Sequence, residues 1–457
     1  QHRRNKRVAM LVILAGLVLL SLTAPLWVLP LVLVVLWIVH EAWFADHLFY
    51  APQDDYQYRF PDAIESYELL IVDGRLTLDP STEVDLEQST LIAKVQINSS
   101  WLGRWFDPGV LLGNDQQTFE RAAQGIRYLN LTGQAAALLA EGLSVRGRFC
   151  TLANTVQLYV FDQPSPVAEN IMILAPHADD AELAAFGLYS SADKVSIVTL
   201  TQGEIEAEHY QRLGLSAQQA AQLKGRLRSW DSMAIPLWGG VPQANCVQLG
   251  YYCMQLPVMA QQPDVAFGSK QSGETDIRSA REHNCIKLPA DNNGAPTWAN
   301  LVADLAACLM HFKPSVVVMP HPEIDPHADH IATTQAFFQA LEQSDWRPQR
   351  LFLYANHLHD NDRWPMGHAN TGVALPPAMV ELPADELFSY VLSDAQQLDK
   401  AMALLMQHDL QSPQPFKKRL RRMIQQVLTG RRWPKTGENE FLRKAVRKHE
   451  VFWVREL

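Results

Sequence analysis

The longest apolar stretch of the chain lies near its beginning. From Val8 to Phe44 the sequence is almost uncharged, with one break at Thr23-Ala24-Pro25. A membrane-spanning helix needs about 20 apolar residues, so this stretch is too long for one span and long enough for two short ones. No small-residue cleavage site follows its first apolar run, which disfavours a signal peptide. We therefore predict a transmembrane hairpin over residues 1–45, with one long tilted span as the alternative.

Basic residues precede this hairpin and set its expected orientation. The cluster RRNKR at residues 3–7 favours a cytoplasmic N-terminus, since basic residues flank the cytoplasmic ends of spans. Two spans would then return the chain to the cytoplasm at residue 46. The five cysteines are scattered without CxxC spacing, which fits a reducing compartment and argues against a cysteine-based zinc site. We expect a protein of the bacterial inner (cytoplasmic) membrane whose body faces the cytoplasm.

Residues 46–166 carry a pattern of short alternating runs. STLIAKVQIN (89–98) and TVQLYVF (155–161) are examples, and Gly, Asp, Asn and Pro separate such runs. This period of two is typical of an antiparallel sandwich or barrel. We predict a β-rich, sandwich-like module here. A structural spacer is the favoured interpretation of the module, and glycan binding is the alternative.

From residue 167 to residue 457 the apolar runs become continuous. Four of them indicate buried strands: NIMILAP (170–176), KVSIVTLT (194–201), SVVVMP (315–320) and RLFLYA (350–355). Apolar residues at helical spacing lie between them, at 217–234 and 298–312. Strands that alternate with helices predict an α/β fold, here a Rossmann-like domain with a mostly parallel sheet.

Charge is distributed unevenly along the chain. The formal net charge is −10, yet residues 413–457 carry 13 Lys and Arg against four Glu. An acidic body does not resemble a nucleic-acid binder, so we expect no nucleic-acid partner. The basic tail would suit anionic lipid or a phosphorylated substrate. A solvated helical surface is the equally favoured alternative.

Side chains that bind metals follow two of the predicted strands. One strand leads into His177-Ala178-Asp179-Asp180-Ala181-Glu182, and another leads into the segment from His321 to His330. One such segment alone is typical of a solvated turn that caps a helix. In open parallel sheets, however, sites form at the carboxyl ends of the strands, so the two segments can face each other. Imidazole and carboxylate groups with one open position are a common catalytic zinc arrangement.

These segments resemble a known family. His177-Ala178-Asp179-Asp180 is similar to the HPDD core of the AHPDDE motif in the PIG-L/LmbE-like zinc-dependent N-deacetylases, and His327-Ala328-Asp329-His330 resembles their HPDH motif. The order of the motifs, their strand contexts and TQGE at 201–204 also match. The resemblance covers about 168–360, and the ending LRKAVRKHEVFW looks like the family's C-terminal helix.

The resemblance implies a role for each matching residue. It makes the zinc (Zn²⁺) ligands His177, Asp180 and His330, and the general base Asp179. His327 would steady the transition state or protonate the leaving amine, and Asp329 would orient a histidine from outside the metal's ligand shell. Arg228 lies on the matching Arg-bearing helix and is a candidate substrate contact.

Four features depart from the family pattern or stand apart from it. Ala178 replaces a proline, and Ala181 stands where the family has a glutamate, with Glu182 one position later. Asp325 occupies a position where some relatives have a tyrosine. The cluster of His357, His359 and Asp360 is interpreted as a surface loop, with a substrate loop as the alternative.

The resemblance implies a zinc-dependent hydrolase that removes the N-acetyl group from an N-acetylglucosamine-type sugar. With the expected anchor, the substrate would be a membrane-associated glycoconjugate, such as a lipid-linked glycan or a lipopolysaccharide intermediate. The expected partners are the membrane and an N-acetylated sugar or glycolipid, and the catalytic domain would face the cytoplasm. Two alternatives are a metal amidase for a small-molecule conjugate and a non-catalytic glycan-binding scaffold in envelope assembly.

Overall fold

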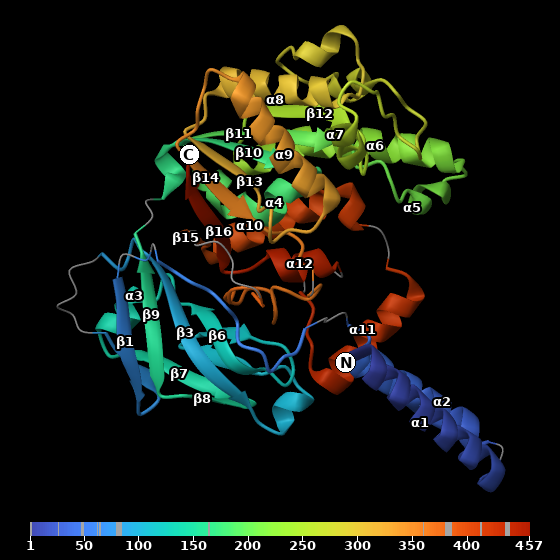
Figure 1. Cartoon of the computed structure of the whole chain (residues 1–457), viewed down its shortest axis with the longest axis vertical. Coiled ribbons are helices and arrows are strands. Elements are labelled where there is room, and N and C mark those ends of the chain that lie inside the picture. Colours follow the sequence, from blue (N-terminus) through green and yellow to red (C-terminus); the bar gives the residue numbers. More distant parts are fainter. Residues whose placement is uncertain are drawn as a thin grey trace. The chain divides into compact units, whose positions relative to one another are not determined.

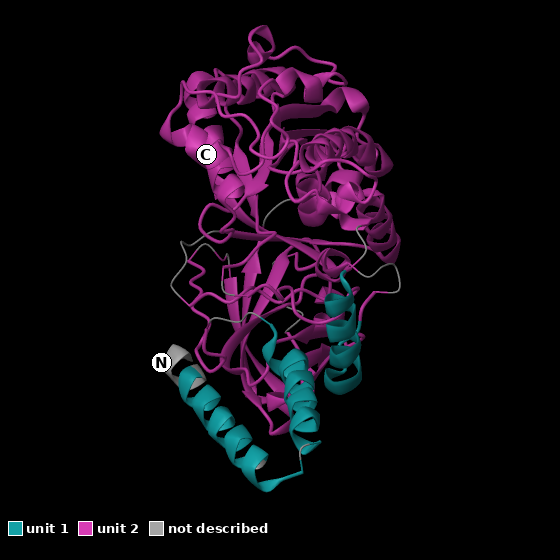
Figure 2. Ribbon diagram, turned by 90° about the vertical axis from the view of Figure 1, so that its right-hand side faces the viewer, with its two compact units in different colours: residues 1–47, 415–432 teal, residues 48–414, 433–457 magenta. Residues whose placement is uncertain are grey.

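The computed structural model describes the chain except for residues 1, 26, 47–49, 62, 64, 79–84, 163–164, 360, 380–385, 412–413 and 435–438. Figure 1 labels most of its helices and strands. The chain forms two compact units, shown in two colours in Figure 2. One unit contains residues 1–47 and 415–432, and the other contains residues 48–414 and 433–457. The predicted boundaries near residues 45 and 166 stay predictions.

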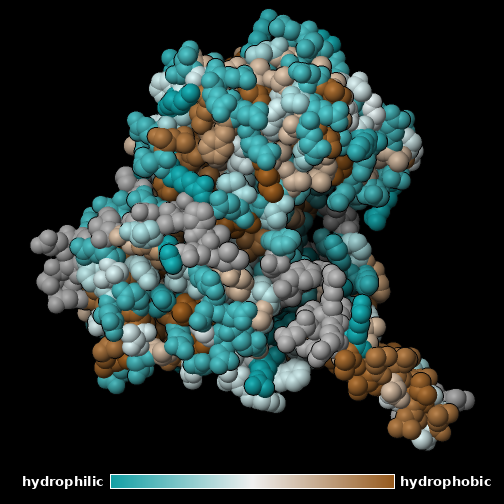
Figure 3. Space-filling model, viewed as in Figure 1, coloured by the Kyte–Doolittle hydropathy of each residue, from teal (hydrophilic) through white to brown (hydrophobic). Residues whose placement is uncertain are grey.

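The smaller unit is helical. It contains α1 (His2–Thr23), α2 (Val28–Val39), the π-helix η1 (His40–Phe44) and α11 (Phe416–Thr429). Arg421 of α11 forms an ion pair with Glu41 of η1, and Arg431 pairs with Asp46 at 2.7 Å. Apolar side chains are exposed along α1 and α2 (Figure 3). Two basic residues of the tail therefore have acidic partners within this unit.

The predicted transmembrane hairpin is not found. The apolar stretch is divided between two helices, because the chain leaves the helical conformation after Thr23. α2 has only 12 residues, and α1 begins with the basic cluster. Among the described residues, no helix combines the length and the apolar character that a membrane span needs. The prediction of the hairpin, and with it that of an inner-membrane protein, is wrong.

The β-rich module of the larger unit is one antiparallel sheet. Its nine described strands run in the order β5-β4-β7-β2-β1-β9-β3-β6, and β8 pairs with β3. They are β1 (Glu65–Val72), β2 (Arg75–Leu76), β3 (Thr90–Ser99), β4 (Gly109–Leu112), β5 (Asp115–Thr118), β6 (Gln124–Asn130), β7 (Leu143–Arg148), β8 (Cys150–Leu152) and β9 (Thr155–Phe161). The short helix α3 (Ala135–Leu139) lies between β6 and β7 in sequence. Alternate residues of β3 and β9, such as Leu91, Val95 and Leu158, fill its core.

A second sheet of the same unit has seven described strands. Its order is β12-β11-β10-β13-β14-β16-β15. The first five strands are parallel, whereas β16 runs antiparallel to both β14 and β15. The strands are β10 (Asn170–Ala175), β11 (Lys194–Thr201), β12 (Cys246–Tyr251), β13 (Val316–Pro320), β14 (Arg350–Tyr354), β15 (Glu386–Val391) and β16 (His449–Glu456).

Helices cover both faces of this sheet. Residues of α7 (Leu256–Gln261), α8 (Trp298–Phe312) and α9 (Ala328–Gln343) share one apolar core with alternate strand residues such as Met172 and Leu174. Residues of α4 (Asp180–Ser191), α6 (Ala217–Ala234) and α10 (Asp394–Met406) share the other core with Ile171 and Ile173. The remaining α-helices among the described residues are α5 (Glu208–Gln211) and α12 (Glu440–Ala445).

Two further expectations need correction. In the ending that resembles the family's C-terminal helix, helix α12 stops at Ala445. The last residues of that ending belong to strand β16, which lies between β14 and β15 in the sheet. The predicted fold class is also wrong, although the mostly parallel sheet is present. The chain is a mixed helix-and-strand protein that contains a nearly closed, barrel-like antiparallel sheet instead of a sandwich, and no described helix that could cross a membrane.

Candidate metal centre

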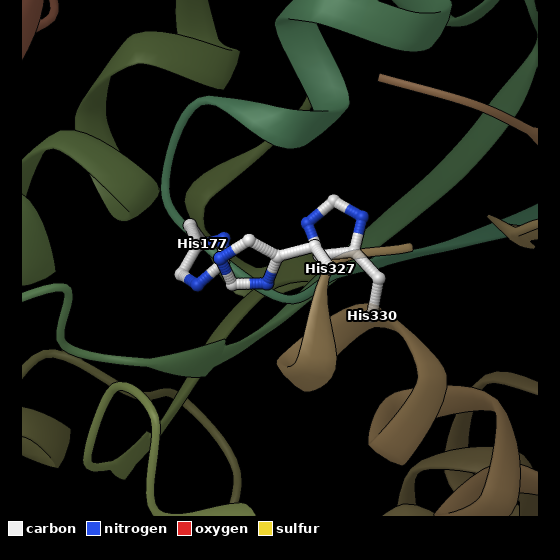
Figure 4. A group of neighbouring side chains, drawn as sticks. All are labelled: His177, His327 and His330. Carbon is white, nitrogen blue, oxygen red and sulfur yellow. The ribbon is translucent and has the colours of Figure 1, made fainter. Parts of the chain in front are cut away.

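The carboxyl ends of the parallel strands bring the two histidine segments together. His177 follows β10, and α4 begins three residues later at Asp180 with Asp179 as its N-cap. His327 is the N-cap of α9, which follows β13. Because β13 pairs directly with β10, both helices begin at the same edge of the sheet. Figure 4 shows the rings of His177, His327 and His330 gathered there.

Asp180 lies between two histidine rings. Its Oδ2 atom is 3.1 Å from Nδ1 of His177 and 3.2 Å from Nε2 of His330. His330 is fully buried, and its Nε2 has no hydrogen-bond partner among the described residues. A buried nitrogen and a carboxylate oxygen that lie this close without a hydrogen bond are costly unless a cation, either a proton or a metal ion, lies between them. The donor atoms of His177, His327 and His330 lie within 4.8 Å of one another, as do those of Asp180, His330 and His357, so the predicted ligands fall in two overlapping groups that could hold a metal ion.

A second layer of hydrogen bonds orients these donors. Asp325 Oδ2 contacts Nδ1 of His330 at 2.9 Å and accepts the backbone N–H of Asn356 at 2.9 Å. The Asn356 side chain donates to Asp180 Oδ1 at 2.8 Å. Burial alone would lower the pKa of His330, but the carboxylates of Asp180 and Asp325 outweigh burial and raise it to about 9. Carboxylates behind a metal-binding histidine fix its tautomer and its orientation.

The other side of His177 meets Asp329 and Cys253. Asp329 Oδ2 lies 3.3 Å from Nε2 of His177 and accepts the backbone N–H of Met254 at 2.7 Å. Cys253 follows β12, and its Sγ lies 3.5 Å from Nε2 of His177. The sequence reasoning missed Cys253, because it tested cysteines for CxxC spacing and not for their place after a strand.

His327 and His357 complete the group of rings. The His327 ring lies 4.9 Å from that of His177 and stacks on that of His357 at 5.2 Å. Burial, reinforced by the neighbouring histidines, lowers the pKa of His327 to about 4. His357 can also contribute a ring nitrogen to a donor group with Asp180 and His330. The surface-loop interpretation therefore does not describe His357. His359 is exposed, and Asp360 lies outside the described residues.

Asp179 contacts Arg228. Its Oδ1 atom accepts a hydrogen bond from Arg228 Nη2 at 2.8 Å. Arg228 is buried and also pairs with Asp409 at 3.0 Å. Gly203 has a φ of +61°, and a Cβ there would lie 2.5 Å from Arg228 Nε, so this position of the TQGE segment requires glycine. Arg228 thus touches the candidate base and is already paired.

Glu182 takes no part in the donor group. It is buried, and its carboxylate accepts hydrogen bonds from Tyr189 at 3.0 Å and from Gln407 at 3.1 Å. Burial raises its pKa to about 8. Its shift by one position from the family glutamate places it in the helix packing of α4.

Comparisons with known proteins give structural neighbours only. No protein-family model and no curated protein matches the chain. Similar solved structures include a deacetylase of the teicoplanin biosynthetic pathway, studied as a triple mutant. It is 15% identical, with a TM-score of 0.33, and the match covers 63% of this chain and 98% of that one.

Two more neighbours are similarly distant. The A40926 pseudoaglycone deacetylase Dbv21 is 16% identical with the same coverage and a TM-score of 0.33. The conserved protein TT1542 from Thermus thermophilus is 17% identical, with a TM-score of 0.28, over 57% of this chain and 87% of that one. At these scores the case for a function rests on the site itself.

Proposed function

We propose that this chain is a zinc-dependent N-deacetylase that acts on an N-acetylglucosamine-type sugar. One observation carries the proposal: the buried, unpaired Nε2 of His330 faces the same carboxylate oxygen as Nδ1 of His177. The resemblance of the two motifs to the PIG-L/LmbE-like deacetylases supports the choice of reaction. The proposed substrate carries its sugar within a larger glycoconjugate, with a glycolipid among the candidates.

Three residues would hold the metal. His177 Nδ1, Asp180 Oδ2 and His330 Nε2 supply two imidazoles and one carboxylate, a ligand set that zinc binds in hydrolases with one position left open. Bound there, zinc would polarise the amide carbonyl and make a water molecule more acidic. Asn356 and Asp325 keep Asp180 and His330 in place for this task.

Asp179 is the proposed general base. Its carboxylate is held by Arg228, so one oxygen is fixed and the side chain does not rotate freely. We assign it to the water that would attack an amide bound at the metal ligands, because it sits next to Asp180 in sequence at the start of α4. In this role it takes the proton of the attacking water and passes it to the amine that leaves.

His327 is the proposed hydrogen-bond donor to the carbonyl oxygen. Its pKa of about 4 makes the ring neutral at pH 7. Its Nδ1 accepts the backbone N–H of Asp329 at 3.3 Å, so the ring proton must reside on Nε2. A neutral imidazole with this tautomer donates one N–H bond to the oxygen on which negative charge develops.

Acetate release tests the proposal directly. The full chain, loaded with one equivalent of zinc, should release acetate from N-acetylglucosamine-containing conjugates, and removal of the metal by a chelator should stop the reaction. Readdition of zinc should restore it. A fully zinc-loaded chain that releases no acetate from lipid-linked, oligosaccharide and small-molecule N-acetyl sugars would overturn the assignment.

A further inference from the structure

The side of His177 that faces away from Asp180 carries a second group of donor atoms. Nε2 of His177, Sγ of Cys253 and Oδ2 of Asp329 all lie within 4.8 Å of one another. The sulfur is 3.5 Å from each of the other two atoms, and the nitrogen is 3.3 Å from the carboxylate oxygen. Cys253 and Asp329 are buried. This group is separate from the Nδ1 side of the ring.

Three different segments hold these atoms in place. His177 follows β10, Cys253 follows β12, and Asp329 lies in the first turn of α9. The backbone N–H of Cys253 donates to Glu204 at 3.2 Å, and that of Met254 donates to Asp329 at 2.7 Å. The thiol is therefore fixed beside the imidazole by its own backbone.

The donor types indicate which ions would fit. A thiolate combined with imidazole and carboxylate suits Zn²⁺ and Cd²⁺, whereas Mg²⁺ and Ca²⁺ prefer oxygen alone. A fourth contact is available, because Oδ1 of Asp329 is buried and has no hydrogen-bond partner among the described residues. The unpaired oxygen is an observation independent of the distances in the group. The short distances and the unpaired oxygen both indicate that this group could bind a cation.

We propose that His177, Cys253 and Asp329 form a second cation site, which takes a thiophilic divalent ion and inhibits the enzyme when it is filled. Binding releases the thiol proton and the Nε2 proton of His177 to solvent. The thiolate and the ring nitrogen then each donate an electron pair to the ion, so the His177 ring bridges two ions. No oxidant or reductant takes part.

Inhibition follows from what the second ion removes. Asp329 now binds the ion, so it no longer accepts a hydrogen bond from His177. The second ion also places a positive charge on the far side of the ring, where it repels the first metal and alters the charge at the reaction centre. The inhibitory effect rests on the proposed deacetylase function, whereas binding of the ion does not.

Cadmium titration tests the binding. The experiment uses the full chain with Cys285→Ala, because Cys285 is exposed and the other cysteines are buried. After loading with one equivalent of Zn²⁺, added Cd²⁺ should produce an ultraviolet sulfur-to-cadmium charge-transfer band that saturates at one Cd²⁺ per chain. Adding Cys253→Ser, which keeps the side-chain size, should abolish the band and keep the first zinc. A band that persists with Cys253→Ser, or one that never forms in the parent, would overturn the site.

Inhibition is measured in the same two proteins. Excess Zn²⁺ should inhibit acetate release in the parent, and Cys253→Ser should raise the half-inhibitory zinc concentration by at least about 10-fold. Equal half-inhibitory concentrations would contradict the inhibitory role. If the deacetylase proposal is wrong, neither protein will release acetate. The cadmium band will still show whether Cys253 binds the ion.

Discussion

Two adjacent aspartates at the start of α4 face different partners. Asp180 contacts His177 and His330, whereas Asp179 accepts a hydrogen bond from Arg228. Successive side chains on a helix point about 100° apart, so neighbours in sequence reach different groups. The pair can therefore divide metal binding and proton transfer between them.

Substitution of these two aspartates should have separable effects. Asp180→Ala should lose stoichiometric zinc, because only two protein ligands would remain. Asp179→Asn should keep its zinc and still lower turnover by about 10²–10⁴-fold, because an amide cannot take a proton. Zinc content and acetate release measure the two effects. Equal zinc loss in both variants would mean that the division of roles is wrong.

The carboxylate behind His330 should contribute to metal affinity. Asp325→Asn keeps the side-chain size but replaces the charged acceptor that contacts Nδ1 of His330. We expect zinc affinity to fall by about 10–100-fold, the usual effect of losing such a partner. Competition with a chelator measures it, and Asp345→Asn, at an exposed position, is the matched control. If the zinc affinity does not change, Asp325 serves only to hold the loop in place.

Sequence reasoning located part of this site. His177, Asp180 and His330 come from two short segments that directly follow apolar strands, so the pattern marks them. Asn356 and Cys253 contact Asp180 and His177 from two other segments, and Arg228, which the sequence marked as a substrate contact, contacts Asp179. These residues lie close to the predicted ligands only because of the order of the strands in the sheet, and a local sequence pattern does not predict that order.

One buried arginine, Arg447, donates hydrogen bonds to the loop between β14 and β15. Arg447, just after α12, is almost fully buried without an acidic partner at hydrogen-bond distance among the described residues. Its guanidinium donates to the carbonyl oxygens of Thr371 at 2.9 Å, Met366 at 2.8 Å and Gly372 at 2.6 Å. The loop between β14 and β15 is thus folded around this side chain.

Loss of Arg447 should destabilise the chain strongly. Arg447→Met removes the donor for several buried carbonyl groups and leaves them unpaired. We expect the free energy of unfolding to fall by at least about 3 kcal/mol. Urea denaturation measures it, with Arg212→Met at an exposed position as the control. A change as small as that of the control would show that the loop finds other donors.

At the scale of helices and strands, two predictions failed because they rested on local sequence and not on the path of the chain. The apolar run at 8–44 has enough residues for two spans, but a break in the helix leaves α2 with 12 of them. His449 to Glu456 form a strand, whereas the resemblance of LRKAVRKHEVFW to the family's C-terminal helix predicted a helix there. β16 needs strands from residues 350 and 386 on its two sides, which is a long-range condition.

At the scale of the whole unit, His449 of β16 joins the two sheets. Its Nδ1 accepts the backbone N–H of Val373 at 3.2 Å, so its Nε2 carries the ring proton and donates to the carbonyl of Thr132, just after β6, at 3.2 Å. The neutral ring is fully paired. Burial lowers the pKa of His449 to about 4.

This histidine should make the stability depend on pH. An unfolded histidine titrates near pH 6.5, about 2.5 units above the folded value. The unfolded state therefore binds more protons below pH 6.5, and stability present above that pH is lost as the pH falls toward 4. By pH 5 the loss is about 2 kcal/mol. His449→Gln lacks this term, so urea denaturation at pH 7 and pH 5 should show a smaller decrease for the variant. Parallel decreases would rule out His449 as the source.

The helical unit is built from segments far apart in the chain. α11 contacts η1 through Arg421 and Glu41, yet residues 47 and 415 are separated by almost the whole larger unit. During synthesis at about 5–20 residues per second, α1, α2 and η1 would wait roughly 20–70 s for α11 to emerge. Until then Glu41 has no Arg421 to pair with. A chain that is truncated before residue 415 would therefore never form the contacts between α11 and η1.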